Sequence, residues 1–267
     1  MLPVYPAISF QRVLEKGGRT KPWLVLVNAG ESIKPYVVKL FKTEMIQELD
    51  SVTKEVLGNV LAKEFDLPVP DAAFIRMDRS FINTITDPQL KIELGEKDGR
   101  LKFGTALLDD FVRFDTRSVS LTEVRRIIEI DQVFAFDNLI RNPDRNEVKP
   151  NLLVRSDEAY LIDHELGFDI AADSLSELDD WQWKERFYRY HIFYEHLKRT
   201  PHTPKKDYFN AFEECLKRLN VNLLVPCFDQ LADHGYPKDK QALILHYLAG
   251  MKQKSTNFVN LLRGLIS

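Results

Sequence analysis

"NPDRNEVKPNLLV", residues 142–154, joins a proline-marked polar loop to a short apolar run, and "LIDHELGF", residues 161–168, ends a second apolar run in acidic residues. Asn-Pro-Asp readily forms a turn. A turn does not require the further series of carboxylate, amide and carboxylate that Asp144, Asn151 and Asp163 provide. We therefore interpret this stretch as a candidate functional loop rather than a connection alone.

Outward from this stretch, hydrophobic periodicity predicts strands early in the chain and helices late in it. The first expected elements, in chain order, are a turn at 17–20, strands at 23–28 and 36–41 joined by a turn at 29–32, a helix at 50–65, a strand at 72–77, and a loop with a short strand over 86–104. A helix at 121–140 and a hairpin of strands at 151–154 and 159–162 follow. The rest of the chain is expected to form helices near 181–199, 205–219, 220–233 and 238–263. This order predicts one α+β domain over residues 1–267. We expect a small β-rich N-lobe over about 1–110 and a larger helical C-lobe over about 111–267, with a ligand site between the lobes.

Composition narrows the classes of function. The 267 residues are 44% hydrophobic and 29% charged with a net charge of −3, which is typical of a globular protein without a basic surface for nucleic acid. The sequence shows neither a membrane-spanning apolar run nor a signal-peptide pattern at its start. The two cysteines, Cys215 and Cys227, lack metal-ligand spacing, and neither HExxH nor GxSxG occurs, which argues against zinc and serine hydrolases. We expect a cytoplasmic protein that binds neither nucleic acid nor a membrane.

A lysine and a glutamate are the first candidates for chemistry. Lys39 lies within the predicted strand 36–41, between Val37 and Phe41 on its own face, and Glu55 lies on the helix that follows. Phosphoryl transfer from ATP requires a lysine that reaches the phosphates, usually with an acidic partner that fixes it. The ordinary alternatives are an edge-strand lysine that extends to water and a solvated helix glutamate. The order of the two residues favours the functional pair.

The opening stretch supplies the other parts of such a site. Asp144 is the candidate base or orienting group for an acceptor hydroxyl. Asn151 is a candidate Mg²⁺ ligand, with Asn146 as the alternative, and Asp163 ends a buried strand where a carboxylate is costly unless paired or bound to a cation. The step from Asp144 to Asn151 is seven residues, so "EVKP" must bulge to bring Asn151 back towards the metal.

Four charged neighbours have open assignments. Arg145 and Lys149 either neutralise charge on the transferring phosphoryl group or belong to a solvated basic loop. His164 either forms hydrogen bonds beside the metal ligands or fills a polar pocket. Glu165 either binds metal or forms a salt bridge with Arg141 or Arg145.

Four segments, in order, resemble those of the HipA-like kinases, in particular the short stand-alone bacterial domains: "YVVKLF", "TKEVLGNVLAKEFDLPVP", "FDNLIRNPDRNEVKPNLLV" and "LIDHELGF". The resemblance spans about residues 16–170. It implies a two-lobed protein-kinase-like fold, related in its core to the phosphoinositide kinases. It also implies ATP- and Mg²⁺-dependent transfer to a serine or threonine hydroxyl of a protein, the kinase itself included.

The resemblance also assigns residues. It implies that Lys39 contacts the ATP phosphates with Glu55 as its partner, that Asp144 is the catalytic aspartate, and that Asn151 and Asp163 bind Mg²⁺. Two features depart from the pattern. The step from the catalytic aspartate to the asparagine is longer than in protein kinases, and histidine and glutamate follow the metal aspartate in place of Phe-Gly.

A glycine pair early in the chain resembles a loop that covers the phosphates. Gly17 and Gly18 are also consistent with an ordinary turn, and no GxGxxG occurs. Some family members phosphorylate a hydroxyl in this loop, and Thr20 is the matching position. Residues 103–111 are expected to offer backbone groups to adenine.

Two other functions compete with a protein kinase. One is a catalytically inactive member that only binds a nucleotide or a partner, and the other is a kinase of small molecules. The retention of Lys39, Asp144 and Asp163 favours activity. A small antitoxin-type protein partner is implied by the resemblance alone.

Overall fold

The computed structural model describes residues 1–14, 21–115, 117–199 and 207–267. These residues form two compact units assembled from discontinuous segments. The first unit contains Met1–Leu57, Pro70–Asp109 and Val225–Lys238, and the second contains Gly58–Val69, Asp110–Leu224 and Asp239–Ser267. The mixed α+β composition expected from the sequence is confirmed.

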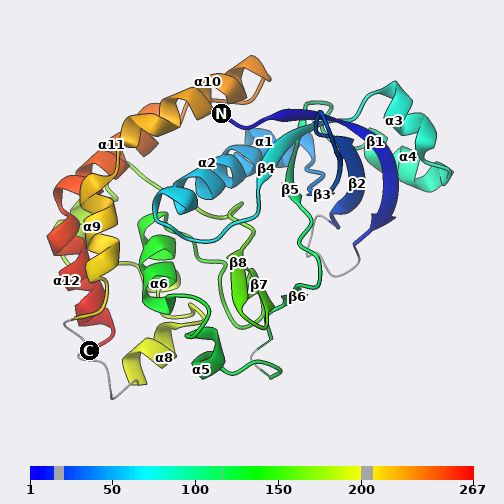
Figure 1. Cartoon of the computed structure of the whole chain (residues 1–267). Helices are drawn as coiled ribbons and strands as arrows, with labels where there is room; N and C mark the ends of the chain where they lie inside the picture. Colours follow the sequence, from blue (N-terminus) through cyan, green and yellow to red (C-terminus); the bar gives the residue numbers. More distant parts are fainter. Residues whose placement is uncertain (15–20, 116, 200–206) are drawn as a thin grey trace. The chain divides into compact units, whose positions relative to one another are not determined.

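A closed five-stranded barrel forms the sheet of the first unit (Figure 1). Its strands, in order around the barrel, are β1 (Val4–Val13), β2 (Trp23–Asn28), β3 (Ile33–Val38), β5 (Lys102–Ala106) and β4 (Ala72–Arg76). Neighbouring strands are antiparallel except β1 and β4, which are parallel. Closure pairs the edges of the sheet with one another, which removes unpaired backbone groups.

Alternating side chains of the strands fill the barrel. The buried apolar cluster includes Val25, Val27, Val38, Ala73 and Ile75. Between β2 and β3 the chain turns as expected, with the Ala29 N–H donating to the Ser32 carbonyl at 2.9 Å. Gly30 has a φ of 86° in this turn, a conformation that glycine adopts without strain from a Cβ atom.

The strand predicted at 36–41 is shifted in the structure. Strand β3 ends at Val38, because its partner β2 begins at Trp23, the residue opposite Val38. Lys39 therefore follows the strand instead of lying in its middle, which corrects the prediction. Its backbone N–H still donates to the Phe103 carbonyl at 3.1 Å, so the backbone at this position is held by β5.

Helices connect the strands of the first unit. The helix expected at 50–65 is confirmed as α2 (Ser51–Glu64), which begins in the first unit and continues into the second. The region 86–104, expected to be a loop with a short strand, contains β5 but also the helix α4 (Pro88–Gly95). Asp87 caps this helix by accepting the Gln89 N–H at 2.8 Å. Two shorter helices, α1 (Thr43–Gln47) and α3 (Arg79–Thr84), complete this set.

The second unit combines a small sheet with most of the helices (Figure 1). Its strands β6 (Val112–Arg113), β7 (Leu152–Arg155) and β8 (Glu158–Leu161) are antiparallel in that order, and β7 and β8 are the expected hairpin. The helices are α5 (Leu121–Val124), α6 (Ile130–Leu139), α7 (Ser176–Asp179), α8 (Tyr194–Arg199), α9 (Asn210–Arg218), α11 (Gln241–Gln253) and α12 (Ser255–Leu265), with 3-10 turns at Glu185–Phe187 and Val221–Leu224. Helix α10 (Val225–Asp233) belongs to the first unit, although the expected N-lobe ended near 110.

Two of the predicted helices are divided, and a third is helical over only a short part of its length. The helix expected at 121–140 stops after α5 and restarts as α6, because Glu129 is extended, with φ −76° and ψ 93°. The helix expected near 238–263 is likewise two helices, which meet at the non-helical Lys254. The segment 181–199 contains only a 3-10 turn and α8. Periodicity identified the buried faces but not these backbone breaks.

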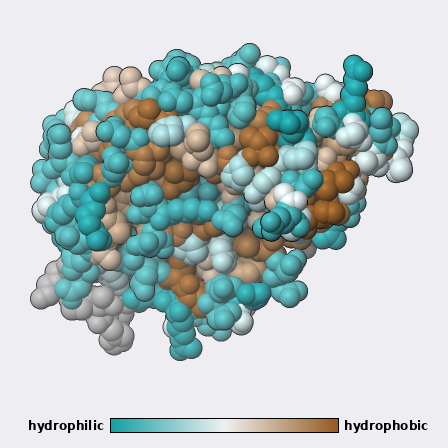
Figure 2. Space-filling model, turned by 45° about the horizontal axis from the view of Figure 1, so that its top comes forward, coloured by the Kyte–Doolittle hydropathy of each residue, from teal (hydrophilic) through white to brown (hydrophobic). Residues whose placement is uncertain are grey.

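Hydrophilic side chains dominate the face of the molecule shown in Figure 2, and the hydrophobic ones there lie in separate patches. Exposed large hydrophobic residues of the second unit include Val112, Val148, Trp181 and Tyr190. Among the described residues, none of the helices has the length and apolar character that crossing a membrane would require.

Candidate functional site

Lys39 and Glu55 form an ion pair within the first unit. Lys39 follows β3 and Glu55 lies on α2, and Lys39 Nζ contacts Glu55 Oε1. The side chain of Glu55 is only 3% exposed and that of Lys39 is 15% exposed. A buried carboxylate is costly unless a cation compensates it, so this pair accounts for a charge among the apolar residues of α2.

The β7–β8 hairpin positions two candidate metal ligands in the second unit. Leu152 pairs with Leu161, and the Ile162 N–H donates to the Asn151 carbonyl at 3.1 Å. Asn151 therefore precedes β7, and Asp163 follows β8, at the same end of the hairpin. Both have left-handed backbones, with φ of 47° and 64°. Residues other than glycine adopt such conformations uncommonly, asparagine and aspartate more readily than most, and these conformations cluster at functional sites.

Asp163 and Glu165 bring carboxylate oxygens close to each other. One oxygen of each lies within 4.8 Å of the other. Two carboxylates at this separation repel unless a cation or another partner compensates them. Carboxylate and amide oxygens are the ligands that Mg²⁺ prefers, so this donor set fits that cation.

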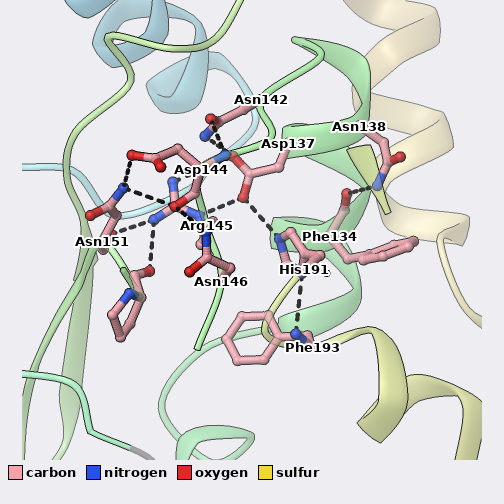
Figure 3. Close-up of polar contacts among 11 residues, drawn as sticks. Phe134, Asp137, Asn138, Asn142, Asp144, Arg145, Asn146, Asn151, His191 and Phe193 are labelled. Atoms are coloured by element: carbon pink, nitrogen blue, oxygen red, sulfur yellow. Dashed lines mark hydrogen bonds and ion pairs between the residues drawn. The ribbon is translucent and has the colours of Figure 1, made fainter. Parts of the chain in front are cut away.

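The candidate catalytic aspartate lies beside the amide of Asn151 (Figure 3). The Asn151 side-chain amide donates to the Asp144 carbonyl at 3.3 Å and to Asp144 Oδ2 at 3.4 Å. Lys149 Nζ lies 3.1 Å from Oδ1 and 3.2 Å from Oδ2 of the same carboxylate. The seven-residue step from Asp144 to Asn151 is thus closed by direct contacts.

A tight turn accommodates the additional residues of this loop. The Asn146 side-chain oxygen accepts the N–H groups of Val148 and Lys149, both at 3.0 Å, and the Asn146 N–H donates to the Lys149 carbonyl at 3.0 Å. These contacts make the bulge that "EVKP" was expected to form. They also use both acceptor sites of the Asn146 side-chain oxygen, so the geometry favours Asn151 over Asn146 as the amide beside Asp144.

A buried carboxylate that was not among the predicted site residues fixes the loop through hydrogen bonds. Asp137, on α6, is fully buried and accepts hydrogen bonds from three side chains (Figure 3). Asn142 Nδ2 donates to Oδ1 at 2.9 Å, Arg145 Nε donates to Oδ2, and His191 Nε2 lies 3.0 Å from Oδ2. The available signal was an aspartate within "VFAFDNLI", where the neighbouring residues of the helix are buried on all sides.

The ionisation of Asp137 and His191 follows from these contacts. Burial alone raises the pKa of Asp137, but the Arg145 guanidinium and His191 outweigh it and hold that pKa well below its usual range. Burial lowers the pKa of His191, against the opposing effect of Asp137. His191 Nδ1 accepts the Phe193 N–H at 3.2 Å, so the neutral ring carries its proton on Nε2 and donates to Asp137.

Arg145 does not have the role considered for it. Its side chain is fully buried, and it donates to Asp137 and to the Asn151 carbonyl. Contact with a transferring phosphoryl group was one expectation and a solvated loop position was the other, and the structure corrects both. Arg145 instead joins Asp137 to the backbone that presents Asn151. Lys149, which is 40% exposed, remains beside Asp144.

The two arginines considered as partners of Glu165 are engaged with other carboxylates. Arg141 is fully buried and its Nη2 donates to Glu177 at 3.0 Å, while Arg145 pairs with Asp137. The suggested salt bridge from Glu165 to either arginine stays a prediction. Glu165 lies close to Asp163, and its role as a metal ligand stays a prediction.

His164 is buried among packed side chains in this structure. It is 2% exposed, its ring lies edge-on to Phe136, and it lies against α2 at Gly58. A Cβ atom at Gly58 would approach His164 Cβ to 2.4 Å, so only glycine permits this contact. This packing is consistent with the pocket-filling interpretation of His164, and its hydrogen-bonding role beside the metal ligands stays a prediction. The glycine within "VLGNVL" was the sequence signal for this packing.

The glycine loop was predicted to cover the phosphates. Gly17, Gly18 and Thr20 lie outside the described residues. Their assignment to phosphate binding and autophosphorylation stays a prediction.

Comparison with known proteins identifies relatives. A model of the family described as HipA-like kinase matches residues 9–225, which confirms the resemblance seen in the sequence. No curated protein matches the chain. Among solved structures, the crystal structure of a Helicobacter pylori proinflammatory kinase, CtkA, matches with 11% sequence identity and a TM-score of 0.48, covering 98% of this chain and 99% of that chain.

Proposed function

This chain belongs to the HipA-like kinase family, and on that premise we propose that it transfers the γ-phosphoryl group of ATP to a serine or threonine hydroxyl of a protein, with Mg²⁺ as cofactor. The observation that supports this most is the contact between Asp144 and the Asn151 amide at the end of the β7–β8 hairpin. This arrangement places a carboxylate for the acceptor hydroxyl beside an amide suited to a metal.

Asp144 is the acceptor-orienting residue of the proposed reaction. Its side chain is 12% exposed, so it is both accessible and held, by Lys149 and Asn151. The acceptor hydroxyl would donate its proton towards this carboxylate as the bond to phosphorus forms. General base assistance of this kind contributes about 10²- to 10⁴-fold in rate.

Asn151, Asp163 and Glu165 are the residues that would hold Mg²⁺. Because the Asn151 amide nitrogen faces Asp144, its oxygen points away and is available as a ligand (Figure 3). Asp163, with Glu165 close by, adds carboxylate oxygens. When bound, the cation would neutralise charge on the phosphates.

Lys39 is the proposed phosphate-binding residue of the first unit. Its pair with Glu55 supports this role, since a fixed lysine contacts phosphates without losing further conformational entropy. We propose the two-lobed protein-kinase-like architecture on the same basis. Autophosphorylation at Thr20 is the corresponding proposal for an acceptor within the chain.

Incubation of the purified protein with labelled ATP and MgCl₂, followed by mass spectrometry, tests the proposal. Phosphate on a serine or threonine of this chain or of an added protein substrate is the expected result. Asp144→Asn should bind ATP with nearly wild-type affinity and lose about 10²-fold or more in turnover. Asp157→Asn, an exposed aspartate in the turn of the same hairpin, is the matched control. Nucleotide binding without transfer in the wild type would contradict the proposal and indicate a binding module.

A further inference from the structure

We propose that Lys149 is a phosphoryl-binding residue of this reaction, carried to Asp144 by the turn over residues 146–149. This inference rests on the proposed function. It assigns a chemical role to the additional length of the loop between Asp144 and Asn151.

The position of Lys149 is the first observation. Its ammonium lies 3.1 and 3.2 Å from the two carboxylate oxygens of Asp144, the residue proposed to orient the acceptor. An ammonium has three N–H donors on a flexible stem. While one donor contacts Asp144, the others can reach an anionic group that lies next to the same carboxylate.

The backbone of Lys149 is anchored, although its side chain is not buried. Asn146 binds the Lys149 N–H with its side chain and the Lys149 carbonyl with its own N–H. Asn146 in turn forms a β-bridge with His191, and the Ile192 N–H donates to the Arg145 carbonyl at 3.0 Å. The turn is therefore fixed to the unit on both sides, and the exposed Val148 occupies its tip.

A contribution to folding stability does not explain why Lys149 pairs with Asp144. The Lys149 side chain is 40% exposed and that of Asp144 is 12% exposed, so solvent reaches the ammonium and screens the pair, which limits its contribution to folding. Arg145, the other cation of the loop, is buried against Asp137. The loop therefore presents Lys149, and not Arg145, towards a ligand at Asp144.

The chemistry of transfer gives Lys149 a function. The acceptor oxygen bonds to the γ-phosphorus while the bond from that phosphorus to the bridging oxygen of ADP breaks. ADP leaves with that electron pair, and the hydroxyl proton passes to Asp144. Negative charge is spread over the three equatorial phosphoryl oxygens during this step. A positioned cation next to Asp144 stabilises that charge more than the charge of bound ATP.

Three variants of the full chain test the inference. Lys149→Met removes the charge and keeps most of the side-chain volume, Lys149→Arg keeps the charge, and Lys217→Met is the matched control. Lys217 lies on α9 with 44% exposure and a 2.8 Å ion pair to Glu213. Steady-state kinetics would be measured with labelled ATP, and affinity for ADP, with and without aluminium fluoride, by calorimetry.

We expect Lys149→Met to lower kcat by about 10²-fold, with KM for ATP and affinity for ADP changed by less than about threefold. It should lose affinity selectively for the ADP–aluminium fluoride complex, which mimics the transferring group. Lys149→Arg should recover most of the rate, and Lys217→Met should match the wild type.

Three results would overturn the inference in distinguishable ways. An active wild type with an unchanged or raised kcat in Lys149→Met would reject the role of Lys149 and leave the proposed function in place. A wild type that transfers no phosphate to any acceptor would reject both. Loss of rate in Lys149→Met without selective loss of the aluminium fluoride complex would indicate that Lys149 only orients Asp144, and would also reject phosphoryl binding.

Discussion

His191 Nε2 donates to the buried carboxylate of Asp137 at 3.0 Å, although 54 positions of sequence separate the two residues. Arg145 donates to the same carboxylate from the loop that carries Asp144. One carboxylate on α6 thereby joins the candidate catalytic loop to the chain that precedes α8. The geometry of the loop depends on this buried charge.

Replacement of Asp137 should destabilise the protein strongly. Asp137→Asn leaves the Arg145 guanidinium buried without its counter-charge, and breaking a buried ion pair in this way costs about 3–5 kcal/mol. Urea unfolding would measure the difference in free energy of unfolding. Asp157→Asn, exposed in the hairpin turn, should change it by about 0.5 kcal/mol or less. Equal effects of the two variants would show that the Asp137 charge is not needed.

Stability should fall as the pH drops below 6.5, with His191 as one cause. Its folded-state pKa is lowered from the usual 6.5, because burial disfavours the charged ring and Arg145 repels it, with Asp137 opposing. The unfolded chain therefore binds a proton that the folded chain does not, and the free energy of unfolding decreases as the pH falls through this range. The pKa of Asp137 is also lowered, so the free energy of unfolding decreases further as the pH falls below 3.8, the usual pKa of an aspartate.

His191→Gln should make this dependence shallower between pH 7 and about pH 5, because glutamine can still donate to Asp137 but does not titrate. Urea unfolding at several pH values would measure it. If the free energy of unfolding of His191→Gln varies with pH as steeply as that of the wild type, His191 does not cause the loss of stability.

Gly58→Ala should destabilise the second unit. Alanine is the better helix former by about 1 kcal/mol, but its Cβ would lie 2.4 Å from His164 Cβ, which forces a shift in a packed interior. We expect a net loss of about 1–3 kcal/mol in the free energy of unfolding. Gly95→Ala, at the end of α4, meets no atom within 4 Å and should be neutral or slightly stabilising. If Gly58→Ala leaves the free energy of unfolding unchanged, His164 can move away from the new Cβ atom without loss of stability.

Asp163→Asn should weaken the metal dependence of nucleotide binding. The substitution removes a charged oxygen ligand, and we expect the gain in ATP affinity that Mg²⁺ provides to fall by at least about tenfold. Calorimetric titration of ATP with MgCl₂ and with EDTA would measure it. Asp157→Asn should retain the full metal dependence. If Asp163→Asn also retains it, the metal is held elsewhere.

Local elements were predictable because their signals lie within a few residues. The helix at 50–65 and the hairpin at 151–154 and 159–162 follow from short-range periodicity and turn residues, and the structure has both. The break between α5 and α6 was missed, since an apolar stripe can continue across a change of backbone direction. The end of β3 was missed because it depends on where its partner β2 begins.

The residue types of the candidate site were evident in the sequence, whereas their contacts were not. Asp144, Asn151 and Asp163 were selected because carboxylates and amides bind metals and orient hydroxyls, which is a property of the side chains alone. Whether a seven-residue step returns Asn151 to Asp144 depended on the turn at Asn146. That turn is local, but several other turn conformations were compatible with the same amino-acid sequence.

What the sequence by itself determined about this protein is its local elements and the chemical groups that it carries. Only the tertiary structure decided that Arg145 is buried against Asp137 while Lys149 faces Asp144, because the burial of a charge depends on packing between distant segments. It also decided the closure of the barrel, since β1 pairs with β4 from Val4 to Phe74 across a long stretch of chain. Such non-local contacts leave no periodic trace in the sequence, and the free energy of a buried charge is settled only when its partner is in place.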